Sequence, residues 1–377
     1  MARRRLGYRH VAVMLGWILA GPAMRSASAQ SADEAFVPRT LARSLETPWA
    51  LAFTPDGRIL VTERPGRIRV IARDSLARAP WASIAVHESA ARDIETGLMG
   101  IAVDPAFARN HRVYVCYTHR GSDGSLVNRI AVLAEQRGRG IGPTVLVDRI
   151  PASIYHDGCR LKFGPDGKLY ATTGDAAGNR AEGNAAQSTA SLAGKVLRIE
   201  PDGSVPRDNP FPGSYVWSYG HRNSQGLAFE PGTGRLFATE HGTGGTGNNE
   251  LNLIERGKNY GWPVAIGVSS DPRFVSPIHV GEDAPAGATF VSGDRYPVLR
   301  GSLLVATLSA ERLLRFTIGA GDGRGDVVRD VLIDGTFGRL RDVVQGPDGI
   351  LYIATSNRDG RGEPGADDDR VIRLEPR

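Results

Sequence analysis

Residues 161–170 read Leu-Lys-Phe-Gly-Pro-Asp-Gly-Lys-Leu-Tyr, and this phrase decides the fold because the chain repeats it. Alternating apolar residues come first, a turn of Pro-Asp-Gly follows, and a second apolar segment begins directly after the turn. Proline fixes φ early in such a turn and glycine accepts the positive φ at its end, so each phrase predicts a tight β-hairpin. The alternation predicts that one face of each strand is buried.

Further copies of the phrase occur along the chain, the clear ones at 51–61, 227–237 and 343–352, a looser one at 101–115 and the weakest at 288–306. The anchoring prolines are Pro55, Pro105, Pro165, Pro231 and Pro347. Copies spaced by roughly 50 to 65 residues are typical of propeller blades. We therefore predict an all-β fold, a six-bladed β-propeller of four-stranded antiparallel blades.

Two other all-β arrangements could also contain such hairpins. A β-sandwich with coincidental hairpins is the main alternative, and a solenoid is less favoured because the chain ends carry no obvious caps. Ring closure would pair a strand near 36–45 with the strand at 371–374, which would remove an exposed sheet edge. Cys116 and Cys159 are the only two cysteines. They could form a disulfide in an oxidising compartment, or remain two separate buried thiols.

The N-terminus has the layout of an export signal. Arg3, Arg4, Arg5 and Arg9 precede an apolar run at 11–20 and the small residues at 27–29. The run is shorter than the roughly 20 residues of a spanning helix, so a membrane anchor is the weaker reading. We expect cleavage after Ala29, a single propeller domain at 30–377, a periplasmic or otherwise exported protein, and no stable membrane insertion.

The formal net charge of +5 resides in this leader, which holds five arginines and no acidic residue. The remaining chain is close to neutral, so the basic pI is no argument for binding nucleic acid, and we expect none.

Polar residues gather in four segments that flank the repeats, at 156–161, 220–226, 240–263 and 339–342. All four could meet at one mouth of the propeller. They contain a histidine suited to proton transfer, arginines suited to carboxylates, and carboxylate and carbonyl oxygens of the kind calcium prefers. The chain has no cysteine cluster for zinc, no phosphate-binding Gly-Lys-Ser/Thr loop and no Gly-x-Ser-x-Gly elbow. From chemistry alone, the mouth is predicted to bind an anion and a cation.

The same segments strongly resemble the soluble PQQ-dependent glucose and aldose sugar dehydrogenases (PQQ is pyrroloquinoline quinone). The resemblance runs from about Leu45 to the end of the chain. The phrases that carry it are residues 62–67 (TERPGR), 97–102 (GLMGIA), 161–175 (LKFGPDGKLYATTGD), 192–198 (LAGKVLR), 220–226 (GHRNSQG) and 259–263 (NYGWP).

The resemblance implies a role for each matching residue. His156 matches the base that takes the proton of the anomeric hydroxyl while hydride passes to the quinone, and Arg222 matches the residue at the quinone oxygen. The carbonyls of Gly242 and Thr243 match ligands of the calcium beside the quinone. Glu250 and Tyr260 match ligands of a second calcium. The remaining cofactor-binding matches are Asn223, Gln225, His241, Arg339 and Arg341, the two arginines being the pair that holds cofactor carboxylates.

Five positions depart from the family pattern. Ser309 stands near the position of a lysine that meets the cofactor, and Arg312 is a candidate to replace that charge. Cys159 replaces a glycine beside the histidine, Thr243 replaces a proline, and Asn249 replaces an aspartate. His241 stands where glucose dehydrogenases have glutamine, a variation that aldose dehydrogenase relatives share.

The sequence thus predicts a PQQ- and calcium-dependent enzyme that converts aldoses to lactones and passes electrons to an exported acceptor. We expect loops between blades, among them 175–187 and 267–278, to set the choice of sugar. Two alternatives stay open. One is a non-enzymatic propeller that binds a glycan or a protein and has lost PQQ, and the other is a calcium-dependent lactonase.

Overall fold

The computed structural model describes residues 36–87, 95–176, 184–243, 247–321 and 326–377. Within these ranges the chain consists almost entirely of strands and turns, with one helical turn, α1 (Phe107–Asn110), and one 3-10 turn, η3 (Ala185–Gln187). No helix in this part of the chain has the length and apolar character needed to cross a membrane. The predicted export signal at 1–29 lies outside the described residues.

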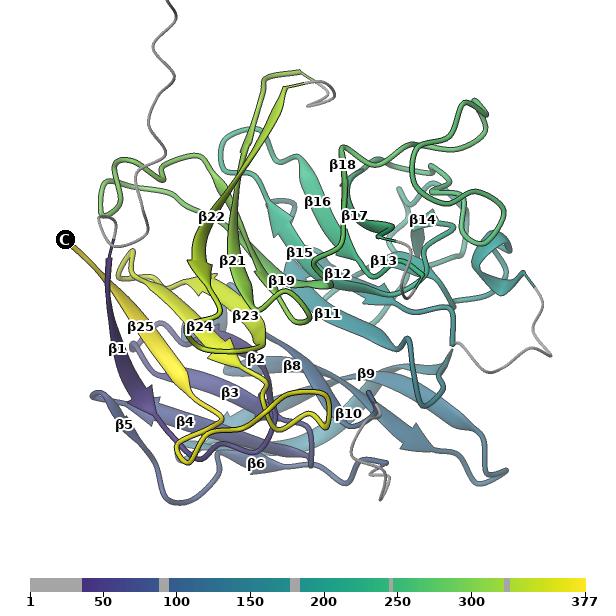
Figure 1. The fold of residues 1–377 in the computed structure, drawn as a ribbon. Helices are drawn as coiled ribbons and strands as arrows, with labels where there is room; N and C mark the ends of the chain where they lie inside the picture. The colour runs from purple at the N-terminus through teal and green to yellow at the C-terminus, as the bar shows by residue number, and fades with distance from the viewer. Residues whose placement is uncertain (1–35, 88–94, 177–183, 244–246, 322–325) are drawn as a thin grey trace, which may run out of the picture. The chain divides into compact units, whose positions relative to one another are not determined.

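The strands form six antiparallel sheets, numbered here as blades in chain order (Figure 1). Blade 1 contains β2 (Pro48–Phe53), β3 (Ile59–Glu63), β4 (Arg67–Ala72), β5 (Ser75–Leu76) and β6 (Ala82–Ser83). Blade 2 contains β7 (Leu98–Val103), β8 (Arg112–Arg120), β9 (Leu126–Gln136) and β10 (Arg139–Pro151). Blade 3 contains β11 (Gly158–Phe163), β12 (Leu169–Thr173), β13 (Lys195–Ile199) and β14 (Val216–Tyr219).

The second half of the ring repeats this order. Blade 4 contains β15 (Ser224–Phe229), β16 (Leu236–Glu240), β17 (Asn249–Ile254) and β18 (His279–Gly281). Blade 5 contains β19 (Pro285–Phe290), β20 (Leu303–Thr307), β21 (Arg312–Ile318) and β22 (Val327–Asp334). Blade 6 contains β23 (Leu340–Gln345), β24 (Leu351–Thr355), β25 (Val371–Pro376) and, at its outer edge, β1 (Phe36–Ala42).

The first strand of each blade is its innermost strand. Contacts between first strands run from β2 to β7, then to β11, β15, β19 and β23, and from β23 back to β2. This closed cycle confirms the six-bladed propeller and excludes the sandwich and the solenoid. Apolar side chains of these strands, such as Leu161 and Leu227, are buried between blades.

The ring closes as the sequence predicts. The N-terminal strand β1 pairs antiparallel with the C-terminal strand β25, from Phe36 opposite Pro376 to Ala42 opposite Val371. Pairing the two ends of the chain in one blade leaves no gap between blade 6 and blade 1.

The repeated phrase forms the hairpin between the first and second strands of a blade. In blade 1 it links β2 to β3, where Gly57 has φ +83° and the Asp56 carboxylate accepts a hydrogen bond from the Thr54 hydroxyl. The hairpins therefore share one end of the ring, which we call the hairpin end. The other end, where first strands begin and second strands finish, we call the mouth.

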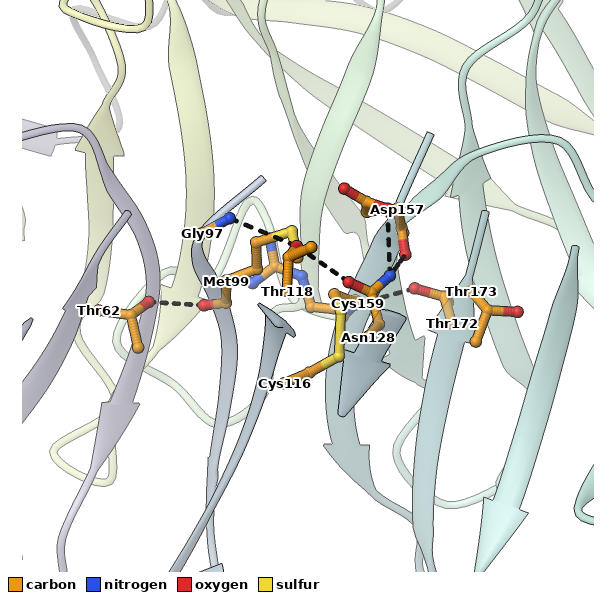
Figure 2. Close-up of a disulfide and its surroundings, with 12 residues drawn as sticks. Thr62, Gly97, Met99, Cys116, Thr118, Asn128, Asp157, Cys159, Thr172 and Thr173 are labelled. Atoms are coloured by element: carbon orange, nitrogen blue, oxygen red, sulfur yellow. Dashed lines mark hydrogen bonds between the residues drawn. A yellow bond between two sulfur atoms is a disulfide. The ribbon is translucent and has the colours of Figure 1, made fainter. Parts of the chain in front are cut away.

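The two cysteines are joined. Cys116 on β8 and Cys159 on β11 form a disulfide between blades 2 and 3, with their Cα atoms 5.5 Å apart (Figure 2). Of the two possibilities that the sequence leaves open, the structure has the disulfide.

Candidate active site

The four polar segments meet at the mouth of the ring. A cavity of about 520 Å³ opens there, within the size range of ligand pockets. The described residues that line it are Glu95, Tyr155, His156, Arg222, His241, Gly242, Thr243, Gly247, Asn249, Glu282, Ala284, Ser309 and Arg361. Five of these were singled out from the sequence as site residues, namely His156, Arg222, His241, Gly242 and Thr243.

His156 precedes β11 and is oriented by a carboxylate from the same blade. Its Nδ1 lies 2.7 Å from Oδ1 of Asp175, which follows β12. The indole Nε1 of Trp262 donates to Oδ2 of Asp175 at 2.7 Å, so both carboxylate oxygens are engaged. With Nδ1 occupied by this pair, Nε2 is the nitrogen left for proton transfer, an arrangement that suits a general base.

A glycine makes this pairing possible. A side chain at Gly174 would place its Cβ 1.6 Å from the carbonyl oxygen of His156. Only a residue without a side chain lets the end of β12 approach the histidine loop so closely, and Asp175 comes directly after it.

Arg222 lies on the neighbouring blade, before β15. Its main-chain N–H donates to Oε1 of Glu240 at 2.6 Å, and its guanidinium lies 5.2 Å from the centre of the Trp262 ring. Its NH1 donates to the carbonyl of His241 at 3.0 Å and also to the carbonyl of Gly242. Nε is buried and has no hydrogen-bond partner among the described residues. Arg222 thus brings positive charge and an unused donor to the cavity.

Glu95 connects two of the polar segments with the loop between β24 and β25. It precedes β7, and Oε2 accepts hydrogen bonds from the main-chain N–H of His156 and from Nδ2 of Asn223, both at 3.1 Å. Arg361 donates to Oε1 at 3.2 Å. Although burial works in the opposite direction, the nearby His241, His156 and Arg361 lower the pKa of this carboxyl. A permanent negative charge therefore faces the cavity beside the histidine.

Two predicted cofactor-binding residues, Asn223 and Gln225, contact Glu95 but are not among the residues that line the cavity. Asn223 and Gln225 are buried. Oδ1 of Asn223 also accepts from the Gly158 N–H at 3.1 Å, and the side chain of Gln225 reaches Glu95 at 3.5 Å. Desolvation lowers the pKa of His241 to about 3, so that imidazole is neutral near pH 7.

The predicted arginine pair already has an anionic partner. Nε and NH2 of Arg339 donate to Oδ2 of Asp359 at 3.1 and 2.9 Å, and NH2 of Arg341 lies 3.3 Å from the same oxygen. Both arginines are buried and neither lines the cavity. Nε of Arg341 has no partner among the described residues.

Ser309 lines the cavity, as its sequence position predicts. Arg312 is not among the lining residues, because its Nε donates to Asp334 at 2.8 Å on the outside of blade 5. Arg361, contributed by the loop between β24 and β25, faces the cavity as a second cation besides Arg222. The expectation that Arg312 replaces the missing lysine is therefore not supported.

Comparison with known proteins places the chain in a family. The glucose/sorbosone dehydrogenase family profile matches residues 45–363, most of the chain. The chain belongs to the glucose/sorbosone dehydrogenase family.

Members of this family with solved structures share the fold closely. A Thermus thermophilus oxidoreductase described as a glucose dehydrogenase is 42% identical, with a TM-score of 0.81 over 90% of this chain and 99% of its own. A PQQ-bound aldose sugar dehydrogenase of Streptomyces coelicolor is 36% identical, with a TM-score of 0.78 over 89% of this chain and 96% of its own. The aldose sugar dehydrogenase YliI of Escherichia coli is 30% identical over 84% of this chain and 89% of its own.

The chemistry of the mouth suits an anionic ligand and a cation. Within the described ranges, Nε of Arg222 and Nε of Arg341 lack acceptors, as expected where carboxylates of a ligand such as PQQ would bind. The carbonyls of His241 and Gly242 converge on the guanidinium of Arg222. Carbonyl oxygens that gather around one positive charge can hold another, such as calcium.

Glu250 and Tyr260 line a second, smaller cavity. Arg222, His241 and Gly242 line both cavities. Glu250 faces Glu240 across the strand pair β16–β17. Burial, and then the charge of Glu240, raise the pKa of Glu250 to about 7. The Tyr260 hydroxyl donates to the Leu253 carbonyl at 2.5 Å, so a cation would have to meet the tyrosine main chain. The facing carboxyl groups of Glu240 and Glu250 are oxygen donors of the kind that calcium prefers.

No group of three or more His, Cys, Asp and Glu side chains is placed to hold a metal ion within the described ranges. A cation at either place would thus depend on main-chain carbonyls together with one or two carboxylates, which suits calcium and not zinc.

Sequence reasoning missed Glu95, Asp175, Asp359 and Arg361 as site residues. Asp175 ends the quoted phrase at 161–175. Its position directly after a glycine at the end of a strand could have indicated a site residue. Glu95 lies two residues before the quoted 97–102 phrase. Asp359 and Arg361 belong to a long loop before β25, and nothing in their spacing indicates the mouth.

Proposed function

We propose that this protein oxidises aldose sugars to lactones, using PQQ and calcium, with His156 as the base. The observation that carries the proposal is the His156–Asp175 pair at the wall of a 520 Å³ cavity, next to Arg222. Membership of the glucose/sorbosone dehydrogenase family and the PQQ-bound relative support it.

In this proposal, some residues of the mouth bind the ligands and others transfer the proton. Nε2 of His156 would accept the proton of the sugar's C1 hydroxyl, and Asp175 would stabilise the imidazolium that forms. Arg222 would stabilise negative charge that develops beside it in a site with little water. PQQ, when bound, would supply the acceptor for the hydrogen and the electron pair that leave C1.

The remaining predicted residues would hold the cofactor and its ion. The carbonyls of Gly242 and Thr243 would ligate the calcium beside the cofactor, and Glu250 with the main chain of Tyr260 would ligate the second. Asn223, Gln225 and His241 would line the cofactor pocket. Arg341 could meet a carboxylate with its unused Nε, whereas Arg339 would act through Asp359.

An exported location also belongs to the proposal. A buried disulfide is stable in oxidising compartments and rare in the reducing cytosol. The Cys116–Cys159 bond therefore supports a periplasmic or otherwise exported enzyme, cleaved near Ala29, that delivers its electrons to an exported acceptor.

Ser309 supports one second candidate, a binding protein that has lost PQQ, because a neutral side chain lines the cavity where relatives have lysine. Titrating calcium-loaded apoprotein with PQQ, then adding aldose while following the quinone absorbance, separates the two. Tight binding followed by bleaching supports the dehydrogenase. No binding at micromolar PQQ, with binding restored in S309K, supports the binding protein.

A further inference from the structure

The segment that carries the histidine has an unusual backbone. His156, Gly158 and Cys159 have φ of +63°, +64° and +67°. This left-handed region suits glycine but is unfavourable for residues with a Cβ. Two of the three residues here are not glycine, so contacts from outside the segment must hold them in place.

Blade 2 supplies most of those contacts. Glu95 accepts from the main-chain N–H of His156. Nδ2 of Asn128 on β9 donates to the main-chain carbonyl and to Oδ1 of Asp157, both at 3.2 Å. Asn128 is fixed in turn by the Thr118 hydroxyl at 3.0 Å, and Figure 2 shows this chain of bonds beside the disulfide.

The disulfide is the covalent member of the same set. Cys116 and Thr118 both lie on β8, so the strand that orients Asn128 also holds Cys159 (Figure 2). Both cysteines are almost completely buried, at 1% and 0% exposed. On its other side the carbonyl of Cys159 packs against Gly100 of β7, where a Cβ would lie 2.0 Å away. The segment is therefore held by contacts with two strands of blade 2, β7 and β8.

We infer that the Cys116–Cys159 disulfide is a positioning element for His156, because it locks the left-handed segment that presents the imidazole to the cavity. This inference rests on the proposed function, in which His156 is the base. A glycine at 159 would adopt the same backbone without help, whereas cysteine depends on outside contacts, of which the bond to Cys116 is the covalent one. Small displacements of a base are costly to turnover, about 100-fold for 1 Å.

Two disulfide-free variants separate positioning from simple stabilisation. C116A/C159A keeps a Cβ at a left-handed position, and C116A/C159G removes it. We expect C116A/C159A to lose about 10-fold or more in kcat with KM and PQQ affinity little changed, and C116A/C159G to recover most of that loss. If the disulfide only stabilised the fold, Tm would fall and both variants would keep wild-type kcat at 25 °C, which would overturn the inference.

A second readout needs neither PQQ nor sugar. In ¹⁵N-histidine NMR spectra of the apoprotein, we expect wild type and C116A/C159G to show one tautomer for His156, with the proton on Nδ1, and C116A/C159A to show a mixture. An unchanged tautomer in C116A/C159A would contradict the inference. If the proposed function failed, wild type would show no sugar-dependent bleaching of PQQ, yet the NMR comparison would still decide the positioning role.

Discussion

The two ends of the central strands use the same residue type for different purposes. At the hairpin end, Gly57 and Gly167 have positive φ but open space around the missing Cβ, with no atom within 4 Å. At the mouth, Gly174 and Gly242 are needed for close approach, because a Cβ would lie 1.6 and 1.8 Å from a carbonyl oxygen. At the hairpin end, glycine serves the turn conformation alone, and the same turn recurs from blade to blade. At the mouth, glycine allows close contacts between distant segments, at the place where the chemistry is expected.

The largest difference between the two ends should appear in turnover. We expect H156Q to lower kcat by about 1,000-fold or more, because glutamine cannot accept the sugar proton, while PQQ binding is retained. The matched change at the hairpin end is D56N, which removes a carboxylate from an exposed turn. It should leave kcat unchanged. The rate of quinone bleaching by aldose measures turnover in both variants. Normal turnover in H156Q would show that His156 is not the base.

Glycine substitutions sharpen the same contrast. G174A should lower kcat by about 10- to 100-fold, since the added Cβ pushes Asp175 away from His156. G57A should leave kcat intact and cost about 1 kcal/mol of folding free energy through its positive φ alone. Steady-state kinetics and denaturant unfolding distinguish the two. If G57A and G174A lost kcat equally, glycine would not have different roles at the hairpin end and at the mouth.

Calcium should stabilise the mouth and not the hairpin end. Saturating calcium is expected to raise Tm by about 3–6 °C by binding the native state alone, and chelation should reverse the effect. E250Q should lose much of this response. E230Q, which breaks the Glu230–Arg235 pair near the hairpin of the same blade, should keep it. A full calcium response in E250Q would exclude Glu250 as a ligand.

The smallest expected effect concerns pH. Burial raises the pKa of Asp157 to about 7, so this carboxyl destabilises the fold increasingly as pH rises from about 4 to 7. At the hairpin end the sign is opposite. Despite partial burial, hydrogen bonds from Arg58 and Thr54 lower the pKa of Asp56, which contributes stability that is lost as pH falls below about 4.

D157N should therefore raise Tm at pH 8 by about 2 °C and change it little at pH 4. D56N should lower Tm slightly at pH 8, and this difference from wild type should shrink as pH falls below about 4. Thermal unfolding across this range measures both, and a D157N variant that is no more stable at pH 8 would contradict the raised pKa.

The fold could be predicted from sequence because the hairpin signal is local. Pro-Asp-Gly and its flanking alternation specify a turn within about ten residues, and the repetition specifies the ring. The closure of β1 on β25 could be predicted because only one strand pairing was left over. The disulfide could not, since two cysteines 43 residues apart are equally compatible with separate burial.

The site could be predicted only in part, because its partners are distant in sequence. His156 and Arg222 are recognisable within their own segments. Glu95 bonds to residues up to 266 positions away, so its role depends on ring geometry that no local pattern contains. The buried partner of Arg339 is a similar case, because Asp359 lies in a loop whose path the repeats do not determine.

The pairing of β1 with β25 has a consequence for how the chain is made. Phe36 is synthesised before any of the six first strands, and its partner Pro376 is synthesised after all of them. Contacts between such distant segments form slowly, and β1 has no partner strand until β25 has been synthesised. Blade 6 is thus the last blade able to form, and a chain crossing a membrane before that moment would travel as an open, unfinished ring.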